Sequence, residues 1–552
     1  MLPFALAILS GLLLCAALPP YDAWWCGWFA LVPLLLALER ATLQRAAILG
    51  LLAGSVTNLG AFYWLVPVML NYSSLGFFSY PVMLGAAVYQ GMPLALWAMV
   101  LRTGWAATGW KRGFGFVVTA LAYPALEYFY PILFPWYLAD TQHTVVSVLG
   151  LVEMGGCGLL SVLIVVVNLV LARLAVGASR QEETEHLWPA PCSARELTFL
   201  TLGTFTGLCL TVFYSGYRNS AIEEQIARAE SLQVGLVQPN HWIEEGSPLE
   251  DLFDYQRMTL DLVESQPLDL VVWPESAVRT PPGLFVSDHG PGGSGEPGLP
   301  LDVREIRQSS SEPGPQFAAD RAPLRERLSV QRGHQTPILF GTALLDADPQ
   351  AQEPVPGRPP TYNCAVLVDE AGKVAGTAAK VKLLLFGETV PLASYFPSLY
   401  RLIPLASALL PGDGPTTLEF RQARLGIMIC YEDILPWFHF RLAQHHPQVL
   451  LNLTNDAWFG KTAEAEAHLA LAKLRAVEGR VYLVRATSTG VSAVIDPLGR
   501  VVGRIEQDER ATLKHKIALL DVRTGFERWG DSVAWLGLFC LLSFLVVRRT
   551  TR

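Results

Sequence analysis

The stretch GIMICYEDILP, residues 426–436, places a thiol at the point where an apolar run meets charged residues. The run LGIMIC (425–430) has the length and character of a buried strand, and an aromatic residue and two acids follow it directly. Free cysteine is among the most buried residue types, so a Cys that ends such a strand is most often a small core side chain. Cys430 is a nucleophile only if other residues make and hold its thiolate.

The composition indicates a membrane protein. Of the 552 residues, 51% are hydrophobic and only 16% are charged, whereas soluble proteins contain about 25% charged residues. A helix that spans a bilayer needs about 20 apolar residues, and the apolar runs predict eight spans. They lie near residues 3–19, 25–38, 47–70, 78–101, 114–134, 144–172, 197–213 and 531–547. The net charge of -8, without a dense Lys/Arg stripe, argues against a nucleic acid partner.

Lys and Arg are confined to alternate loops between these spans. The loops after the second, fourth and sixth spans contain them, whereas PPYDAWW, NYSSLGFFSY and PWYLADTQHT, after the first, third and fifth, contain none. Because basic loops stay in the cytoplasm, both termini are predicted to be cytoplasmic. The sequence therefore predicts a seven-helix transmembrane domain (1–217), an external domain (218–528), and a last transmembrane helix with a cytoplasmic tail (529–552).

The external domain alternates short apolar runs with longer amphipathic ones, which favours a layered α/β domain. Strands are predicted at 232–238, 268–273, 337–344, 364–369, 425–430, 448–454, 481–487 and 491–496, and helices at 248–264 and 465–480. Residues 281–335 are rich in Gly, Pro and Ser and are predicted to be a flexible insertion.

Two further residues at predicted strand ends could activate the thiol. Glu275 follows VVWP, where burial would raise its pKa towards that of a general base. Lys380, in AAKVKLLLFGE, is a cation that could stabilise an oxyanion or a thiolate. Each residue also has a plainer explanation: Glu275 as a turn cap, Lys380 as a solvated lysine, and Cys430 as the disulfide partner of Cys364. Sequence spacing leaves these alternatives open.

The motifs VVWPES, AAKVKLLLFGE and GIMICYED occur in the order and spacing of the carbon-nitrogen hydrolase (nitrilase) superfamily, which the chain resembles. YNCAVLVD (362–369), NLTNDAWFG (452–460) and LRAVEGRVYLVRATSTG (474–490) extend the resemblance across most of 230–500. With the seven-plus-one membrane arrangement and PPYDAWWCGWFALVPLLLAL near the N-terminus, the chain is similar to the apolipoprotein N-acyltransferase family.

This resemblance implies an αββα sandwich that carries a triad of Glu275 as general base, Lys380 as oxyanion stabiliser and Cys430 as nucleophile. It also implies supporting or substrate-binding roles for Glu388, Tyr431, Glu432, Asn363 and Trp242. Trp242 would stand in for a substrate-contacting Trp of the family. No metal and no cofactor is implied.

The implied reaction moves an acyl group from a phospholipid, through a thioester on Cys430, to the α-amine of the diacylglyceryl cysteine of an apolipoprotein. Its implied place is the bacterial inner membrane, with the catalytic domain in the periplasm. Two alternatives stay open: a membrane-tethered amidase that uses the same triad with water, and a non-enzymatic transporter or scaffold. Leu385 stands where the family has Pro, and ATSTG (486–490) replaces STNNG. These departures concern selectivity more than reaction class.

One acid lies inside a predicted span. Glu127, in AYPALEYFYPILFPW, is a functional candidate because acids within the membrane are rare and costly. The alternative is a Glu at a helix end that reaches the membrane interface.

The alternation of basic loops gives a testable topology. A reporter fused after residue 215 is expected to be external, and one fused after residue 550 is expected to be cytoplasmic. Both positions can be assayed with a pair of reporters that are each active on one side only. Finding the two fusion points on the same side of the membrane would exclude the eight-span arrangement.

Overall fold

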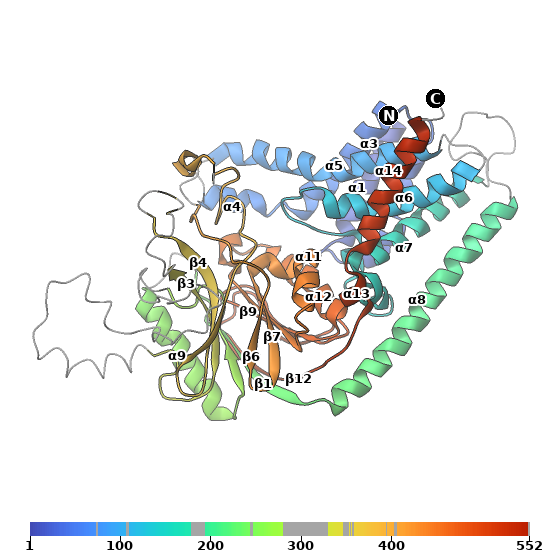
Figure 1. Cartoon of the computed structure of the whole chain (residues 1–552). Coiled ribbons are helices and arrows are strands. Elements are labelled where there is room, and N and C mark those ends of the chain that lie inside the picture. Colours follow the sequence, from blue (N-terminus) through green and yellow to red (C-terminus); the bar gives the residue numbers. More distant parts are fainter. Residues whose placement is uncertain are drawn as a thin grey trace, which may run out of the picture.

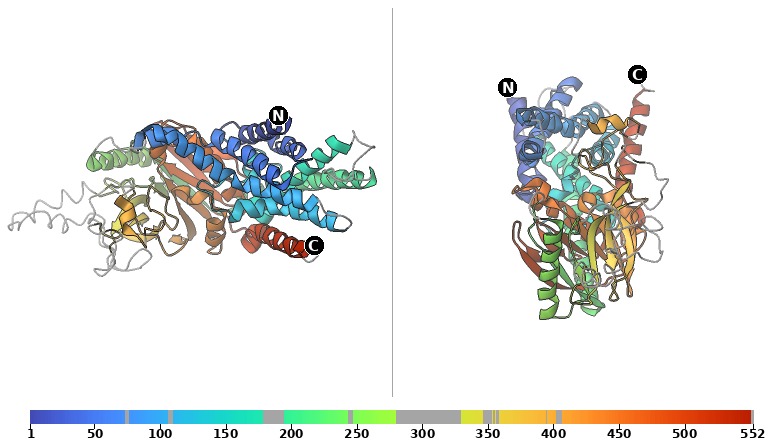
Figure 2. Two further views of the ribbon diagram at one scale, coloured as in Figure 1. Left: turned by 90° about the horizontal axis from the view of Figure 1, so that it is seen from above. Right: turned by 90° about the vertical axis from the view of Figure 1, so that its left-hand side faces the viewer.

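The computed structural model describes residues 1–72, 76–105, 110–177, 194–242, 247–279, 329–345, 353, 355, 358–393, 395–401 and 406–549. Apolar helices gather at one end of the molecule, and two six-stranded sheets lie at the other (Figure 1). Both chain termini lie at the end of the helical part that is farthest from the sheets (Figures 1 and 2).

Each predicted span overlaps at least one helix, although residues 130–134 of the fifth span and 144–149 of the sixth lie outside the helices. The helical part contains α1 (Leu2–Ala17), η1 (Trp24–Trp28), α2 (Val32–Ala37), α3 (Leu43–Ala61), α4 (Leu65–Tyr72), α5 (Ser79–Trp105), α6 (Trp110–Phe129), α7 (Gly150–Gly177), α8 (Ala194–Arg228) and α14 (Ser532–Arg549). The helix α8 continues past the predicted domain boundary at residue 217.

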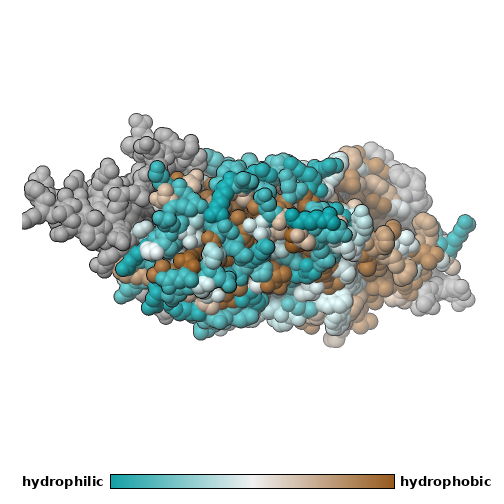
Figure 3. Space-filling view, turned by 90° about the horizontal axis from the view of Figure 1, so that it is seen from below, coloured by the Kyte–Doolittle hydropathy of each residue, from teal (hydrophilic) through white to brown (hydrophobic). Residues whose placement is uncertain are grey.

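By length and composition, three of the described helices can cross a membrane: Gly76–Gly104, Gly150–Val176 and Ala194–Arg228. A fourth is gained if Leu43–Ala61 and Leu65–Asn71, bent by 59°, form one span. The other predicted spans are shorter apolar helices, at Leu2–Ala17, Trp24–Ala37, Gly113–Phe129 and Ser532–Val547. On the face shown in Figure 3, hydrophobic residues predominate over the helical part and hydrophilic residues over the sheets. The helical part is therefore the predicted membrane domain. That it crosses the membrane eight times stays a prediction.

The strands form two sheets, with the orders β12-β1-β2-β3-β4-β5 and β11-β10-β9-β8-β7-β6. Their bounds are β1 (Ser231–Gln238), β2 (Leu270–Val272), β3 (Ile338–Leu345), β4 (Thr361–Val368), β5 (Val374–Ala379), β6 (Thr417–Phe420), β7 (Ala423–Ile429), β8 (Val449–Thr454), β9 (Tyr482–Thr487), β10 (Ser492–Ile495), β11 (Val501–Ile505) and β12 (Ala511–Ala518). All the predicted strands are present. The additional strands β5, β6, β11 and β12 are the outer strands of the two sheets.

The two sheets pack face to face through apolar side chains, among them Leu236 and Leu339 of one sheet and Ile427 and Leu451 of the other. On the outer face of the first sheet lies α9 (Pro248–Ser265). The outer face of the second is covered by α11 (Pro436–Ala443) and α12 (Glu464–Gly479). The predicted αββα sandwich is therefore confirmed.

The predicted insertion 281–335 lies outside the described residues as far as residue 328. Its end is described and is packed. Val330 is 3% exposed in the core beside α9, and Gln331 Nε2 donates to the carbonyl oxygens of Thr336 and Asp369, both at 2.8 Å. Residues 329–335 thus belong to the sandwich.

A buried ionic contact joins the two domains. Glu153, in the first turn of α7, accepts a hydrogen bond from Nε of Arg480 (2.9 Å) and another from Nε of Arg218 on α8 (2.9 Å). The side chain of Arg480 follows α12 and is fully buried. Leu474 and Val477 of α12 pack into the core of the helical domain. The sandwich is therefore fixed on α7 through α12.

Breaking this contact tests how the domains are joined. Glu153→Ala leaves the Arg480 guanidinium buried without its counter-charge, which is expected to lower the free energy of unfolding by about 3–5 kcal/mol. Glu224→Ala is the matched control. Glu224 and Arg228 form an ion pair at 3.6 Å in which both side chains are exposed, and such a pair contributes about 0–1 kcal/mol to the free energy of unfolding. Thermal unfolding of the full chain in detergent measures both. Equal melting temperatures for the two variants would contradict this account.

Candidate active site

Glu275 lies just beyond the end of β2, and its side chain is 8% exposed. The chain here comes so close to β3 that a Cβ at Gly341 would lie 2.5 Å from the Cα of Glu275. The N–H of Gly341 donates to the carbonyl of Pro274 (3.0 Å). Only glycine leaves room for this approach, so Gly341 fixes the position of the Glu275 backbone.

Lys380 follows β5 directly and is 1% exposed. Its Nζ donates to Oε1 of Glu275 (3.0 Å) and to Oε1 of Glu388 (2.9 Å). Burial acts to lower the pKa of Lys380, but electrostatic interactions with Cys430, Glu275 and Glu388 outweigh it and hold this pKa well above its ordinary value. Lys380 is thus a buried ammonium, and the alternative of a solvated lysine is wrong.

Asn363 on β4 bridges the same two carboxylates as the lysine. Its Nδ2 donates to Oε1 of Glu275 (2.6 Å) and to Oε1 of Glu388 (3.1 Å). The remaining oxygen of Glu275, Oε2, accepts from the backbone N–H of Asn455 (3.0 Å). Burial raises the pKa of Glu275, Lys380 opposes this effect, and the like charge of Glu388 adds to it. A carboxylate with a raised pKa is suited to take a proton near neutral pH.

Cys430 comes directly after β7, with φ at 55°, in the left-handed region that is unfavourable for a residue with a side chain. Hydrogen bonds hold it there. The Cys430 carbonyl accepts from Nδ2 of Asn452 on β8 (2.9 Å), and Oδ1 of Asn452 accepts from Nη1 of Arg485 on β9 (3.2 Å). The three neighbouring strands of the second sheet thus fix the turn that carries the thiol.

The environment of Cys430 favours the neutral thiol. Burial raises its pKa well above the ordinary value, Glu275 adds to this effect, and Lys380 opposes it. Such a thiol needs a base before it can attack. Cys364 and Cys430 are both free thiols, so the alternative of a disulfide between them is wrong.

Glu432 ties the turn after β5 to the end of β7. Its Oε1 accepts from the backbone N–H groups of Val381 (2.7 Å) and Lys382 (2.9 Å), and its Oε2 accepts from that of Ile429 (2.9 Å). Burial raises the pKa of Glu432 to about 7. Its carboxylate therefore holds the segments that carry Lys380 and Cys430 together.

Tyr431 lies beside the lysine, and Trp242 lies elsewhere. The hydroxyl of Tyr431 donates to the carbonyl of Leu383 (2.9 Å), and Nζ of Lys380 is 5.9 Å from its ring centroid. The ring of Trp242 lies 6.0 Å from Nζ of Lys461. No hydrogen bond or ring contact within the described residues links Trp242 to the triad, so its substrate role stays a prediction.

A closed ionic cluster lies behind the nucleophile. Ligand atoms of Asp456, Glu464 and His468 lie within 4.8 Å of one another, a spacing that suits a metal ion. However, Arg485 already pairs with Asp456 (3.0 Å). Burial and Arg485 act to lower the pKa of His468, but Asp433 and Asp456 raise it to about 10. Arg485 and His468 thus balance Asp433 and Asp456, while burial and the charge of Asp456 raise the pKa of the third acid, Glu464, to about 8.

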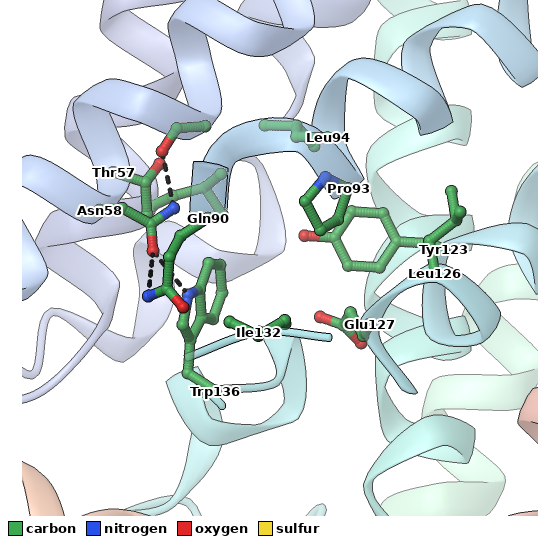
Figure 4. A pocket seen from close by; sticks show the side chains of 12 residues that line it. Thr57, Asn58, Gln90, Pro93, Leu94, Tyr123, Leu126, Glu127, Ile132 and Trp136 are labelled. Atoms are coloured by element: carbon green, nitrogen blue, oxygen red, sulfur yellow. Dashed lines mark hydrogen bonds between the residues drawn. The ribbon is translucent and has the colours of Figure 1, made fainter. Parts of the chain in front are cut away.

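The helical domain has a small cavity of about 30 Å³ (Figure 4). Glu127 of α6 lines it, 7% exposed, and Oε1 of Glu127 accepts from the N–H of Leu138 (2.7 Å). Across the cavity, Nε1 of Trp136 donates to Oδ1 of Asn58 (3.1 Å). The carboxylate is enclosed within the protein near the end of α6, and its depth in the membrane stays a prediction.

Two family models match the chain: carbon-nitrogen hydrolase over residues 233–525, and the apolipoprotein N-acyltransferase N-terminal domain over residues 10–170. An apolipoprotein N-acyltransferase of Geobacter metallireducens is 28% identical, over 96% of this chain and 92% of its own length. The apolipoprotein N-acyltransferase of Azotobacter vinelandii is also 28% identical, over 99% of this chain and 95% of its own length. A crystal structure of Saccharomyces cerevisiae Nit3, of the nitrilase superfamily, is 17% identical and covers 52% of this chain and 90% of its own, with a TM-score of 0.35.

The carbon-nitrogen hydrolase model covers more than half of the chain and includes Glu275, Lys380 and Cys430. The chain therefore belongs to the carbon-nitrogen hydrolase family.

Proposed function

We propose that the protein is an apolipoprotein N-acyltransferase, which moves an acyl group from a phospholipid to the α-amine of a diacylglyceryl cysteine through a thioester on Cys430. The observation that carries this proposal is the buried ammonium of Lys380, held 3.0 Å from Glu275 and 2.9 Å from Glu388 beside the Cys430 turn. Similarity to curated relatives of that name over nearly the whole chain supports it. So does the apolar helical domain, because both substrates are confined to a membrane.

In the first half-reaction Glu275 takes the proton of the Cys430 thiol, and the sulfur attacks the ester carbonyl carbon of the phospholipid. Negative charge develops on the carbonyl oxygen, and the Lys380 ammonium stabilises it in a site from which water is largely excluded. The C–O bond then breaks, and Glu275 returns its proton to the departing glycerol oxygen. The products are a lysophospholipid and an acyl thioester on Cys430.

In the second half-reaction the α-amine of the lipid-modified cysteine attacks the thioester carbon. Glu275 takes a proton from the amine, Lys380 again stabilises the oxyanion, and the C–S bond breaks. Glu275 passes its proton to the departing sulfur, so the thiol of Cys430 is restored and the amide product leaves. Splitting one difficult transfer into two easier steps is the advantage of a covalent intermediate.

The proposed orientation places the sandwich in the periplasm and both termini in the cytoplasm of a bacterial inner membrane. Two observations support it: the alternation of basic loops, and the position of both termini at the end of the helical domain opposite the sandwich (Figure 1).

Product analysis tests the reaction. Purified enzyme is incubated with phospholipid labelled in an acyl chain, with and without a diacylglyceryl peptide. We expect labelled N-acyl peptide when the peptide is present. Labelled free fatty acid, formed equally with and without the peptide, would favour hydrolysis instead.

The nucleophile can be identified by trapping the intermediate. Without an acceptor, label from the phospholipid is expected on Cys430 and should be released by hydroxylamine. Cys430→Ala should abolish both the label and the product. Cys364→Ala is the matched control, because Cys364 is a fully buried thiol in the core beside α9. Label on Cys364, or turnover of Cys430→Ala at the wild-type rate, would exclude Cys430 as the nucleophile.

The pH dependence of acylation tests the base. Because the pKa of Glu275 is raised, the rate should fall on acidification at a pH above the ordinary Glu value of about 4.3. Glu388→Gln removes a like charge that raises this pKa, so the acid limb should move to lower pH. Glu275→Gln should slow acylation about 100- to 10,000-fold. Single-turnover labelling of Cys430 over a range of pH measures the acylation rate of the wild-type protein and of both variants. If the acid limb of the pH profile did not move in Glu388→Gln, the assignment of Glu275 as the base would be contradicted.

A further inference from the structure

A cavity of about 430 Å³ lies at the junction of the two domains, and none of the proposed catalytic residues lines it. The catalytic domain contributes α11 and the short helix α13 (Gly525–Trp529), and the helical domain contributes α6 and α14. Its walls include Tyr128, Trp437, Arg441, Trp529, Asp531 and Trp535. A volume of this order falls within the range of small-molecule sites, about 300–1,000 Å³.

Arg441 supplies a cation to this cavity. It lies in the last turn of α11 and is exposed. Its guanidinium lies over the ring of Trp437, 5.4 Å from the ring centroid. No ion pair links Arg441 to a carboxylate within the described residues, so its donors are available to an anion. A guanidinium presents several N–H groups in a plane and suits phosphate especially well.

Asp531 supplies an anion to the same cavity. It immediately precedes α14 and hydrogen-bonds with Tyr128. Its carboxylate oxygen Oδ2 is buried and has no hydrogen-bond partner among the described residues. The Asp531 carboxyl group lies in the cavity wall, where it suits a ligand that brings a cationic hydrogen-bond donor.

The aromatic residues place the cavity at the depth of lipid headgroups. Trp529 and Trp535 lie on either side of the junction between α13 and α14 and are 67% and 59% exposed. Exposed Trp at the end of an apolar helix is typical of the membrane–water interface. The face of a Trp ring also attracts ammonium groups.

We propose that this cavity binds the headgroup of a zwitterionic, amine-bearing phospholipid, with its phosphate on Arg441 and its ammonium on Asp531 and the Trp rings. A purely anionic headgroup would leave the carboxylate of Asp531 unpaired next to negative charge, and a purely cationic ligand would leave Arg441 unpaired. The bound lipid would join α11 of the catalytic domain to α14 of the helical domain. The proposal rests on the membrane position of this junction and is independent of the acyl-transfer reaction.

Binding measurements on the delipidated full-length protein in detergent test the site. Native mass spectrometry gives the Kd of phosphatidylethanolamine and of phosphatidylglycerol. We expect Arg441→Gln to weaken binding of both lipids about 10- to 100-fold, since each loses a charge-assisted hydrogen bond to its phosphate. Asp531→Asn should weaken the binding of phosphatidylethanolamine by a similar factor. It should leave the binding of phosphatidylglycerol unchanged or make it tighter.

Arg257→Gln is the matched control, because Arg257 is an exposed arginine on α9, on the opposite side of the sandwich from the helices (Figure 1). It should change neither Kd. Trp529→Leu, at an exposed position, gives a second test and should weaken phosphatidylethanolamine selectively. Unchanged Kd values in both Arg441→Gln and Asp531→Asn, or an equal loss of both lipids in Asp531→Asn, would overturn the proposal. Labelling of Cys430 in the same variants is scored separately, so failure of the lipid site and failure of the proposed reaction are distinguishable.

Discussion

The buried charge of Lys380 is the constraint on which the active site depends. An ammonium that is 1% exposed is tolerated only when anions and hydrogen-bond acceptors surround it. Glu275 and Glu388 supply both, and Asn363 holds their oxygens in place. The same burial makes the lysine useful, because a charge in a site of low dielectric stabilises a nearby oxyanion far more than a solvated charge does. Stability and chemistry therefore require the same three charges.

The sandwich brings these residues together because parallel strands end at one edge. Glu275 follows β2 of the first sheet, and Cys430 follows β7 of the second. Two contacts between neighbouring strands then fix the two turns: Gly341 lets β3 approach the Glu275 backbone, and Asn452 of β8 holds the Cys430 carbonyl. Because each turn is held by its own strand and by a neighbouring strand, the side chains of Glu275 and Cys430 have little conformational freedom. A general base and a nucleophile must be held in a fixed relative position to react efficiently.

The sequence predicts the centre of this fold better than its edges. Central strands such as VLLNLT of β8 are buried along their whole length and read as continuous apolar runs. The outer strand β12, ATLKHKIA, is half exposed and mixes Lys and His with apolar residues, so its pattern is weak. The site divides in the same way. The triad residues are visible as strand-end motifs, whereas the hydrogen bond from the Asn455 backbone N–H to Glu275 uses no side chain. The contacts that Glu432 makes to residues 381 and 382 depend on tertiary structure that spacing does not reveal.

One helix links the chemistry to the membrane domain. The N-terminal part of α12 carries His468, whose Nε2 lies 2.9 Å from Oδ1 of Asp433, a residue of the Cys430 turn. Its C-terminal end leads to Arg480, which binds Glu153 of α7. The 16 residues of α12 span about 24 Å as a regular helix, and most of them are buried. A rigid element anchored at both ends sets the distance of the nucleophile from the helical domain. An enzyme whose substrates are confined to a bilayer needs this distance to be constant, because the substrates stay at a fixed depth in the membrane.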